Sequence, residues 1–459
     1  MKGLNMNKIS LITVLFLLVA TVTQAQVKKG DVLIKNGTLL TITNGTLENT
    51  DILVQNGKIS KIGKNIKAPN GVDIIDADGK FVMPGIIDAH SHIAGTSINE
   101  GTSQVTAEVS MEDVVDPFDI AIYRALAGGV TTINLMHGSA NVIGGRNETL
   151  KLRYGTTNPD DLRFEDAPRT IKFALGENPT RGGRSRGIQP QSRMGVEAML
   201  RNSFSEALVY KKAWGDYRAD KNKRKVAPDY SLRMETLVEI LDGKILVHCH
   251  SYRADEIYML MKVFTDFGIK KLTFQHANEA YKVAPELAAF GASASVFADW
   301  WAYKLEVYYS TAYNAAILTK NGVTTSINSD SGELIRHLFH EAAKTQKYGN
   351  LSDNEALALI TLNPAKQLGI DNRVGSLEKG KDADITIFDK HPLSTYAIPQ
   401  MTFVDGVKYF DKATDAKDQR IFISPESSID VVQIFDREDQ HQCMQDAEMV
   451  DFNVLFNNK

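Results

Sequence analysis

The chain has 459 residues, of which 43% are hydrophobic and 24% are charged, and its formal net charge is −4. This length is too great for one ordinary core and fits a large domain with a smaller accessory domain. The small net charge gives no electrostatic case for nucleic acid or an anionic membrane surface. We therefore expect no nucleic-acid partner. A small-molecule or short-peptide substrate is a separate expectation, which rests on the residues described below, and we leave open whether the chain forms an oligomer.

Residues 1–25 have the pattern of a secretory signal peptide. Lys2 and Lys8 precede an apolar run at 12–20, and small residues ending at Ala25 follow it. The run is short for a transmembrane helix, which needs about 20 residues. We expect cleavage near Ala25, a periplasmic or secreted protein, and no integral membrane segment after cleavage.

Residues 26–83 predict short alternating strands separated by tight turns. Asn-Gly and Asp-Gly pairs, such as Asn36-Gly37 and Asp78-Gly79, supply the positive φ angles that hairpins need. The alternating pattern returns in residues 379–425. We expect these two segments to form the first and second parts of one small β-sandwich, with residues 426–459 as a C-terminal tail.

Residues 84–378 alternate strand-like runs with amphipathic helical patterns, which is typical of the α/β class. About eight such units fit the length, so we expect a (β/α)8 TIM-like barrel. The strand-like runs are 129–135, 170–175, 244–249, 271–275, 293–297 and 323–327. A Gly-, Arg- and Pro-rich stretch at 178–190 breaks this rhythm and is predicted to be a long loop.

Imidazoles and a carboxylate follow the predicted strands. His90 and His92 end an apolar run and share one face of a strand, because side chains two apart point the same way. In a barrel this face points into the interior, and the active site lies at the carboxyl ends of the strands. Two imidazoles that converge there bind zinc well. Further strand ends carry His248, His250, His276 and Asp330, so we predict a metal site there.

These residues, in this order, resemble the metal-dependent amidohydrolase superfamily, in the imidazolonepropionase-like branch that includes metal-dependent prolidases. The flanking motifs VMPGIIDAHSH (82–92), TLNPAK (361–366) and GSLEKGKDAD (375–384) resemble it too. The resemblance implies a split β-sandwich beside the barrel. It also implies metal-binding roles for His90, His92, Lys172, His248, His276 and Asp330.

Lys172 lies in a segment that resembles the one in which related prolidases carry a carboxylated lysine. A carbamate formed from CO₂ on this amine would bridge two metals, and burial among cations favours the neutral amine that this reaction needs. The alternatives are Glu177 as the bridging ligand, or a lysine that pairs with an acidic neighbour and binds no metal.

His250 shares a strand face with His248 and is a candidate for substrate binding. Arg253, just past the same strand end, and His137, at the end of another strand, are further candidates. Arginines of the 178–190 stretch are a further candidate for a substrate carboxylate.

The predicted activity is hydrolysis of a C–N bond in a dipeptide, an amide or a cyclic amide. A hydroxide activated by one or two divalent metal ions, with zinc expected, attacks the carbonyl, and Asp330 acts as general base. The alternatives are a mononuclear deaminase- or esterase-type hydrolase on the same barrel, or a barrel that binds without catalysis.

Overall fold

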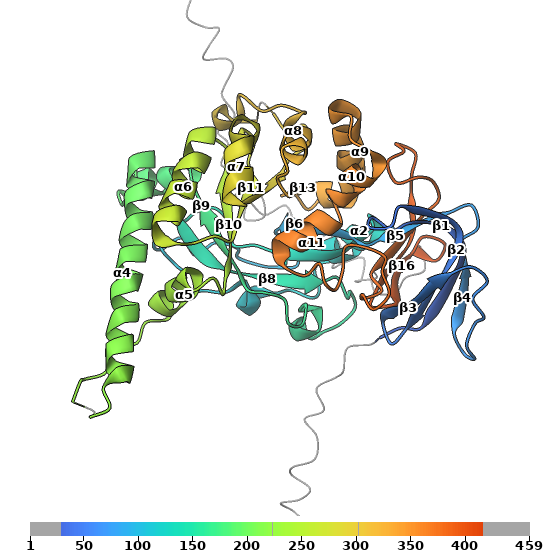
Figure 1. Cartoon of the computed structure of the whole chain (residues 1–459), viewed down its shortest axis with the longest axis horizontal. Coiled ribbons are helices and arrows are strands. Elements are labelled where there is room, and N and C mark those ends of the chain that lie inside the picture. The colour runs from blue at the N-terminus through green and yellow to red at the C-terminus, as the bar shows by residue number, and fades with distance from the viewer. Residues whose placement is uncertain (1–28, 223, 302, 416–459) are drawn as a thin grey trace, which may run out of the picture.

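A computed structural model of the chain describes residues 29–415, apart from 223 and 302. The predicted signal peptide and the predicted tail at 426–459 lie outside the described residues. Two eight-stranded sheets organise the described part (Figure 1). In this part of the chain no helix is both long enough and apolar enough to cross a membrane.

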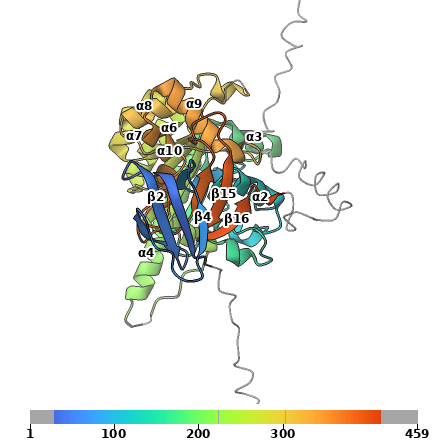
Figure 2. The same ribbon diagram turned by 90° about the vertical axis from the view of Figure 1, so that its right-hand side faces the viewer.

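The first sheet combines the two ends of the described chain, in the order β16-β15-β14-β5-β1-β2-β3, with β4 beside β1. β14 pairs antiparallel with β5, so the segment after the barrel joins the segment before it. Figure 2 shows β15 and β16 beside the first strands of the chain. That the two segments combine was expected; a two-layered sandwich and the domain boundaries stay predictions. The strands are β1 (Val32–Leu40), β2 (Thr46–Gln55), β3 (Lys58–Gly63), β4 (Asp73–Asp76), β5 (Phe81–Pro84), β14 (Ile385–Phe388), β15 (Pro399–Val404) and β16 (Val407–Asp411).

The second sheet is a nearly closed barrel with the order β13-β12-β11-β10-β9-β8-β7-β6. Its strands are almost wholly buried, because helices cover their outer face while other side chains fill the interior. The strands are β6 (Ile86–Ser91), β7 (Val130–Leu135), β8 (Ile143–Lys151), β9 (Thr170–Ala174), β10 (Leu246–Ser251), β11 (Leu272–His276), β12 (Ser293–Val296) and β13 (Thr325–Ile327).

The helices lie mainly between the barrel strands and after the last of them (Figure 1). The α-helices are α2 (Ile120–Ala127), α3 (Glu177–Arg186), α4 (Arg193–Ala219), α5 (Leu232–Leu241), α6 (Ala254–Phe267), α7 (Ala284–Phe290), α8 (Asn314–Lys320), α9 (Leu338–Gly349), α10 (Asp353–Ala358) and α11 (Leu362–Leu368). Short 3₁₀ turns are η1 (Met111–Val114), η2 (Pro159–Leu162), η3 (Ala280–Val283), η4 (Leu305–Val307) and η5 (Leu334–His337).

The barrel departs from eight regular β-α units at β8. This strand runs antiparallel to both β7 and β9, and no α-helix separates it from either. The reason is the length of the connection at 136–142: it suffices to join antiparallel strands, whereas a parallel return needs about a dozen residues or more.

The predicted loop at 178–190 is wrong over most of its length, because residues Glu177–Arg186 form α3. Its proline lies in the first turn, where no backbone N–H is needed, and Gly187 ends the helix with a left-handed φ of 66°. Gly183 packs so closely on the Pro190 carbonyl that a Cβ would lie 1.9 Å from its oxygen. Glycine here therefore serves helix packing, a role that composition alone does not distinguish from loop formation.

The seam between β13 and β6 closes the barrel. Backbone carbonyls of Leu359 and Ile360 accept hydrogen bonds from Ile327 and Ile87, so a segment between α10 and α11 lies along the seam. A second contact joins β6 to the residues after β13. The buried Asp88 carboxylate accepts hydrogen bonds from the backbone N–H groups of His90 and Ser329 and from the Ser329 hydroxyl.

Candidate functional site

The barrel interior holds a cluster of titratable side chains toward the carboxyl ends of its parallel strands. The members of this barrel-end cluster are His90 from β6, His92 just after it, Lys172 from β9, His250 from β10, His276 from β11 and Asp330 from the loop after β13. All six residues are buried. Side chains from distant parts of the sequence therefore share one small, largely dry volume.

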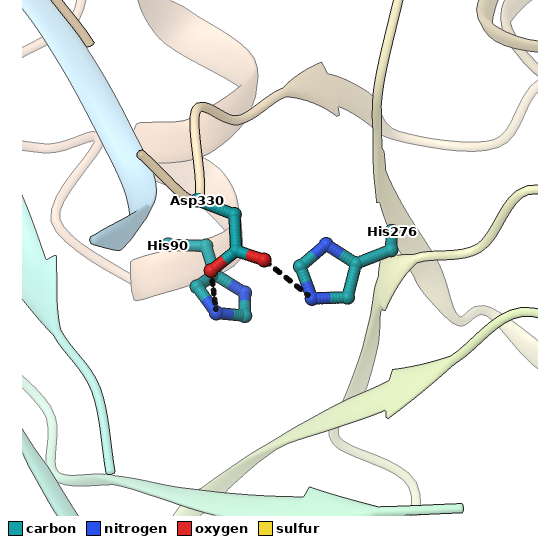
Figure 3. A group of neighbouring side chains, drawn as sticks. All are labelled: His90, His276 and Asp330. Carbon is teal, nitrogen blue, oxygen red and sulfur yellow. Dashed lines mark ion pairs between the residues drawn. The ribbon is translucent and has the colours of Figure 1, made fainter. Parts of the chain in front are cut away.

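The Asp330 carboxylate lies among three imidazoles. Its Oδ1 is 3.4 Å from Nε2 of His90 and 3.3 Å from Nε2 of His92, and its Oδ2 is 3.6 Å from Nε2 of His276. Figure 3 shows the carboxylate between the rings of His90 and His276. Three Nε2 atoms thus surround the carboxylate group.

Two of these residues have a backbone conformation that side-chain-bearing residues rarely adopt. The φ angle is 66° at His276 and 47° at Asp330, and Ala277 follows with 36°. Positive φ costs free energy in residues other than glycine, and outside ordinary Asn and Asp turns it is found at active sites and ligand-binding sites among other places. At His276 this turn follows directly after β11.

Lys172 and His250 extend the cluster. The Nζ of Lys172 lies 3.1 Å from Nε2 of His90. The ring of His250 packs edge-on against that of His276, with centroids 4.8 Å apart, and both residues are fully buried. Tyr252 covers this pair from the mouth of the barrel, with its ring centroid 4.6 Å from that of His250.

The donor atoms of the cluster fit a bound cation. Neither ring nitrogen of His250 or of His276 makes a hydrogen bond to a described residue, and neither does Oδ1 of Asp330. Buried polar atoms usually have partners, so this group of side chains could bind a metal ion. One ligand atom each from His90, His276 and Asp330 lies within 4.8 Å of the others.

The charge states also suit a metal. Burial lowers the pKa of His276 to about 3, against the opposing effect of Asp330. Burial alone would raise the pKa of Asp330, but His276 and His92 outweigh it and hold that pKa below its usual value. His276 is therefore a neutral imidazole at neutral pH, which is the form that binds divalent metals.

His248, an expected metal ligand, lies deeper in the barrel than His250. It pairs in register with Lys172 on β9, and its Nδ1 lies 2.8 Å from Nε2 of Gln275. Burial lowers the pKa of His248 to about 3. His250, expected to bind substrate, occupies the level of His276 instead.

The other predicted residues lie around the cluster. Both nitrogens of His137 are engaged locally, Nδ1 with the Gly138 carbonyl at 2.9 Å and Nε2 with the Glu100 backbone N–H at 3.0 Å. Arg253 forms two hydrogen bonds to Asp255 and is partly exposed.

Glu177, the alternative bridging ligand, begins α3 and pairs with Nζ of Lys304 at 3.2 Å. Arg184 and Arg186 on the same helix contact backbone carbonyls.

Three further residues of the site were not identified from the sequence. Gln275 contacts both His90 and His248. Tyr252 lies two residues after His250, and strand periodicity could have placed it near that side chain. Lys304, which lies 4.5 Å over the Tyr252 ring, follows no periodic pattern.

The chain is similar to known proteins in both sequence and fold. Residues 305–413 match the Amidohydrolase family. The crystal structure of an amidohydrolase from Thermotoga maritima MSB8 is 34% identical and superposes with a TM-score of 0.77, covering 83% of this chain and 100% of that one. The chain belongs to the amidohydrolase family. The predicted family is thus confirmed, and this amidohydrolase is an enzyme of the hydrolase class that acts on carbon–nitrogen bonds.

Two sequence relatives point to the same family. Amidohydrolase tasK of Hapsidospora irregularis is 32% identical over 77% of this chain, which spans only 39% of the length of that fungal protein. Imidazolonepropionase of Thermoplasma volcanium is 25% identical over 72% of this chain and 82% of its own length.

Proposed function

We propose that this amidohydrolase is metal-dependent and cleaves an amide bond in a dipeptide, a small amide or a cyclic amide. The observation that carries the proposal is the set of buried, unsatisfied donor atoms on His250, His276 and Asp330, which face one another at the barrel end. A buried cluster of imidazoles and a carboxylate at strand ends fits a divalent cation, which supports the proposal.

The ligands we propose are His90, His92, His276 and Asp330, with His250 in the place first expected for His248. A divalent metal held there, with zinc as our expectation, would supply a water molecule acidic enough to act as nucleophile near neutral pH and would polarise a carbonyl group. These side chains lie on or directly after the buried strands of a nearly closed barrel, which supports a preorganised site.

Asp330 is the proposed general base and general acid. Its carboxylate is ionised at neutral pH, because its pKa lies below the usual value, and its Oδ1 makes no hydrogen bond to a described residue. It accepts the proton of the attacking water and delivers it to the leaving nitrogen. The products are a carboxylic acid and an amine.

Lys172 is the proposed bridging residue, as a carbamate formed with CO₂. Its burial and its position 3.1 Å from His90 support this role. Glu177 is less suited, because it lies on α3 and forms an ion pair with Lys304. Export to the periplasm or the medium, after cleavage near Ala25, is a further proposal that rests on the sequence pattern alone.

Metal content tests this account. The purified chain is supplied with zinc and bicarbonate and analysed for metal ions per chain. Lys172→Ala and His250→Ala are analysed in the same way. His340→Ala is the control, because His340 lies on α9 outside the cluster. We expect two metal ions per chain in the wild type and the control, with one or none in the other two variants.

One metal ion, retained in Lys172→Ala, would show that the lysine is no bridge and would favour mononuclear chemistry such as that of a deaminase. No bound metal in the wild type would overturn the proposed function as a whole.

A further inference from the structure

The side chain of Gln275 lies between two histidines and contacts the same ring nitrogen of each. Its Oε1 is 3.2 Å from Nδ1 of His90, and its Nε2 is 2.8 Å from Nδ1 of His248. All three residues have no exposed surface. No solvent therefore competes for these hydrogen bonds.

Because Gln275 contacts both rings, its amide makes one imidazole donate a hydrogen bond from Nδ1 and the other accept one at Nδ1. One end of the Gln275 side chain only accepts hydrogen bonds and the other only donates them, while a neutral imidazole has one N–H and one lone pair. If His90 donates from Nδ1, then Nδ1 of His248 must accept, and the proton of His248 lies on Nε2. Turning the amide over exchanges both roles, so only one of the two Nε2 atoms can offer a lone pair.

The end of this chain of hydrogen bonds at the barrel-end cluster sets its direction. Nε2 of His90 points at the barrel-end cluster, 3.4 Å from Oδ1 of Asp330, where a metal ligand must present a lone pair. A proton on Nδ1 of His90, given to Oε1 of Gln275, leaves that lone pair free. His92 is fixed in the same tautomer by the Met136 carbonyl, 2.9 Å from its Nδ1.

We propose that Gln275 and His248 are positioning residues that hold His90 with its proton on Nδ1 and its lone pair directed at the metal. His248 then binds no metal and acts through Gln275. This inference rests on the proposed function, in which His90 is a metal ligand, and it explains why β10 carries two inward histidines with different surroundings.

Zinc affinity, measured by competition with a coloured chelator, tests the proposal in the wild type, His248→Leu, Gln275→Leu, the double variant and His248→Asn. We expect each leucine variant to bind zinc about 10- to 100-fold more weakly, as is usual when the hydrogen-bond partner of a ligand histidine is lost. The double variant should be no weaker than the single ones, because both changes break the same chain. His248→Asn is the conservative rescue: the asparagine carbonyl replaces Nδ1 as acceptor, so this variant should keep its affinity within a few-fold of the wild type.

The proposal is overturned if His248→Asn loses a metal ion per chain, as His250→Ala is expected to, or if the two leucine substitutions weaken binding additively. A wild type that binds no zinc would instead refute the proposed function. Should the leucine variants not fold, the ¹⁵N spectrum of histidine side chains in the wild type decides. We expect His248 to keep its Nε2–H before and after zinc is added, and loss of that proton on adding zinc would refute the positioning role.

Discussion

At the scale of single residues, burial sets which groups near the barrel end carry charge. Glu256 on α6 is only 4% exposed, and its Oε1 lies 3.1 Å from Nε of Arg193. Its pKa is nevertheless raised from 4.5 to about 7, because burial and the nearby Glu306 outweigh the attraction of Arg193. The ionised form of this carboxyl is therefore a cost to the folded state.

Because of this cost, the free energy of unfolding falls as pH rises and Glu256 ionises. Because the folded-state pKa of Glu256 lies above the unfolded value, the wild type loses stability as pH rises from about 4.5 to 7. Glutamine cannot ionise, so Glu256→Gln does not lose stability in this way. We expect the free energy of unfolding of the variant, relative to the wild type, to increase by about 3 kcal/mol between pH 5 and 8, at about 1.4 kcal/mol per pKa unit.

Urea unfolding of the two proteins at several pH values measures this difference. A difference that stays constant or shrinks as pH rises would mean that the ion pair with Arg193 dominates. The other titrating groups are shared by both proteins and cancel in the comparison.

Residue positions within the site could be predicted only as far as strand periodicity holds. His90, His92 and Asp330 were expected together and lie together. Periodicity places Gln275 and His276 on opposite faces, yet both reach the interior, because the left-handed backbone at His276 redirects its side chain. His248 and His250 do share a face, but which of them lies near His276 depends on the register of β10 with β11, which the sequence does not reveal.

At the scale of elements, β8 connects the barrel to the flanking sheet through its last residue. The Nζ of Lys151, fully buried, contacts three carboxylates, those of Asp382, Asp384 and Asp405, at 2.7–3.2 Å. These carboxylates lie just before β14 and between β15 and β16. The lysine therefore pairs with carboxylates from a segment more than two hundred residues away.

Replacing this lysine should destabilise the fold strongly. Lys151→Met leaves buried carboxylates without their central cation, and we expect a loss of about 3–5 kcal/mol in the free energy of unfolding. Lys58→Met is the matched control: Lys58 pairs with the same Asp382 at 2.7 Å but its side chain is 54% exposed, so about 1 kcal/mol or less is expected. Denaturant unfolding compares the two, and equal losses would show that the buried position adds nothing.

The type of each element could be predicted where the pattern was long and regular, as in α6 and β10. Local composition misled for α3, because its glycines serve close packing and a C-terminal cap and do not form a loop. The antiparallel β8 could not be foreseen, since whether a strand returns parallel or antiparallel depends on its connections, and its sequence has no signature of direction.

At the scale of the whole molecule, the order of segments predicted the architecture well. Alternating strands on both sides of a long β-α region indicated that the two ends combine, and β14 pairs with β5 accordingly. The barrel then brings His90 and Asp330 to one seam, where Asp88 and Ser329 hold β6 to the end of β13. The fold itself does not reveal the substrate, and Lys304, which lies 4.5 Å over the Tyr252 ring beside the cluster, follows no sequence pattern.

The measurement that tests the central claim most directly is amide hydrolysis with and without metal. Release of free amine from a panel of dipeptides and cyclic amides is followed for the chelator-treated chain, the same chain reloaded with zinc, and Asp330→Asn reloaded in the same way. We predict turnover in the reloaded wild type, its loss after chelation, and a rate at least about 100-fold lower in Asp330→Asn. Equal rates with and without metal, an unaffected Asp330→Asn, or no release from any member of the panel would contradict a metal-dependent amide hydrolase.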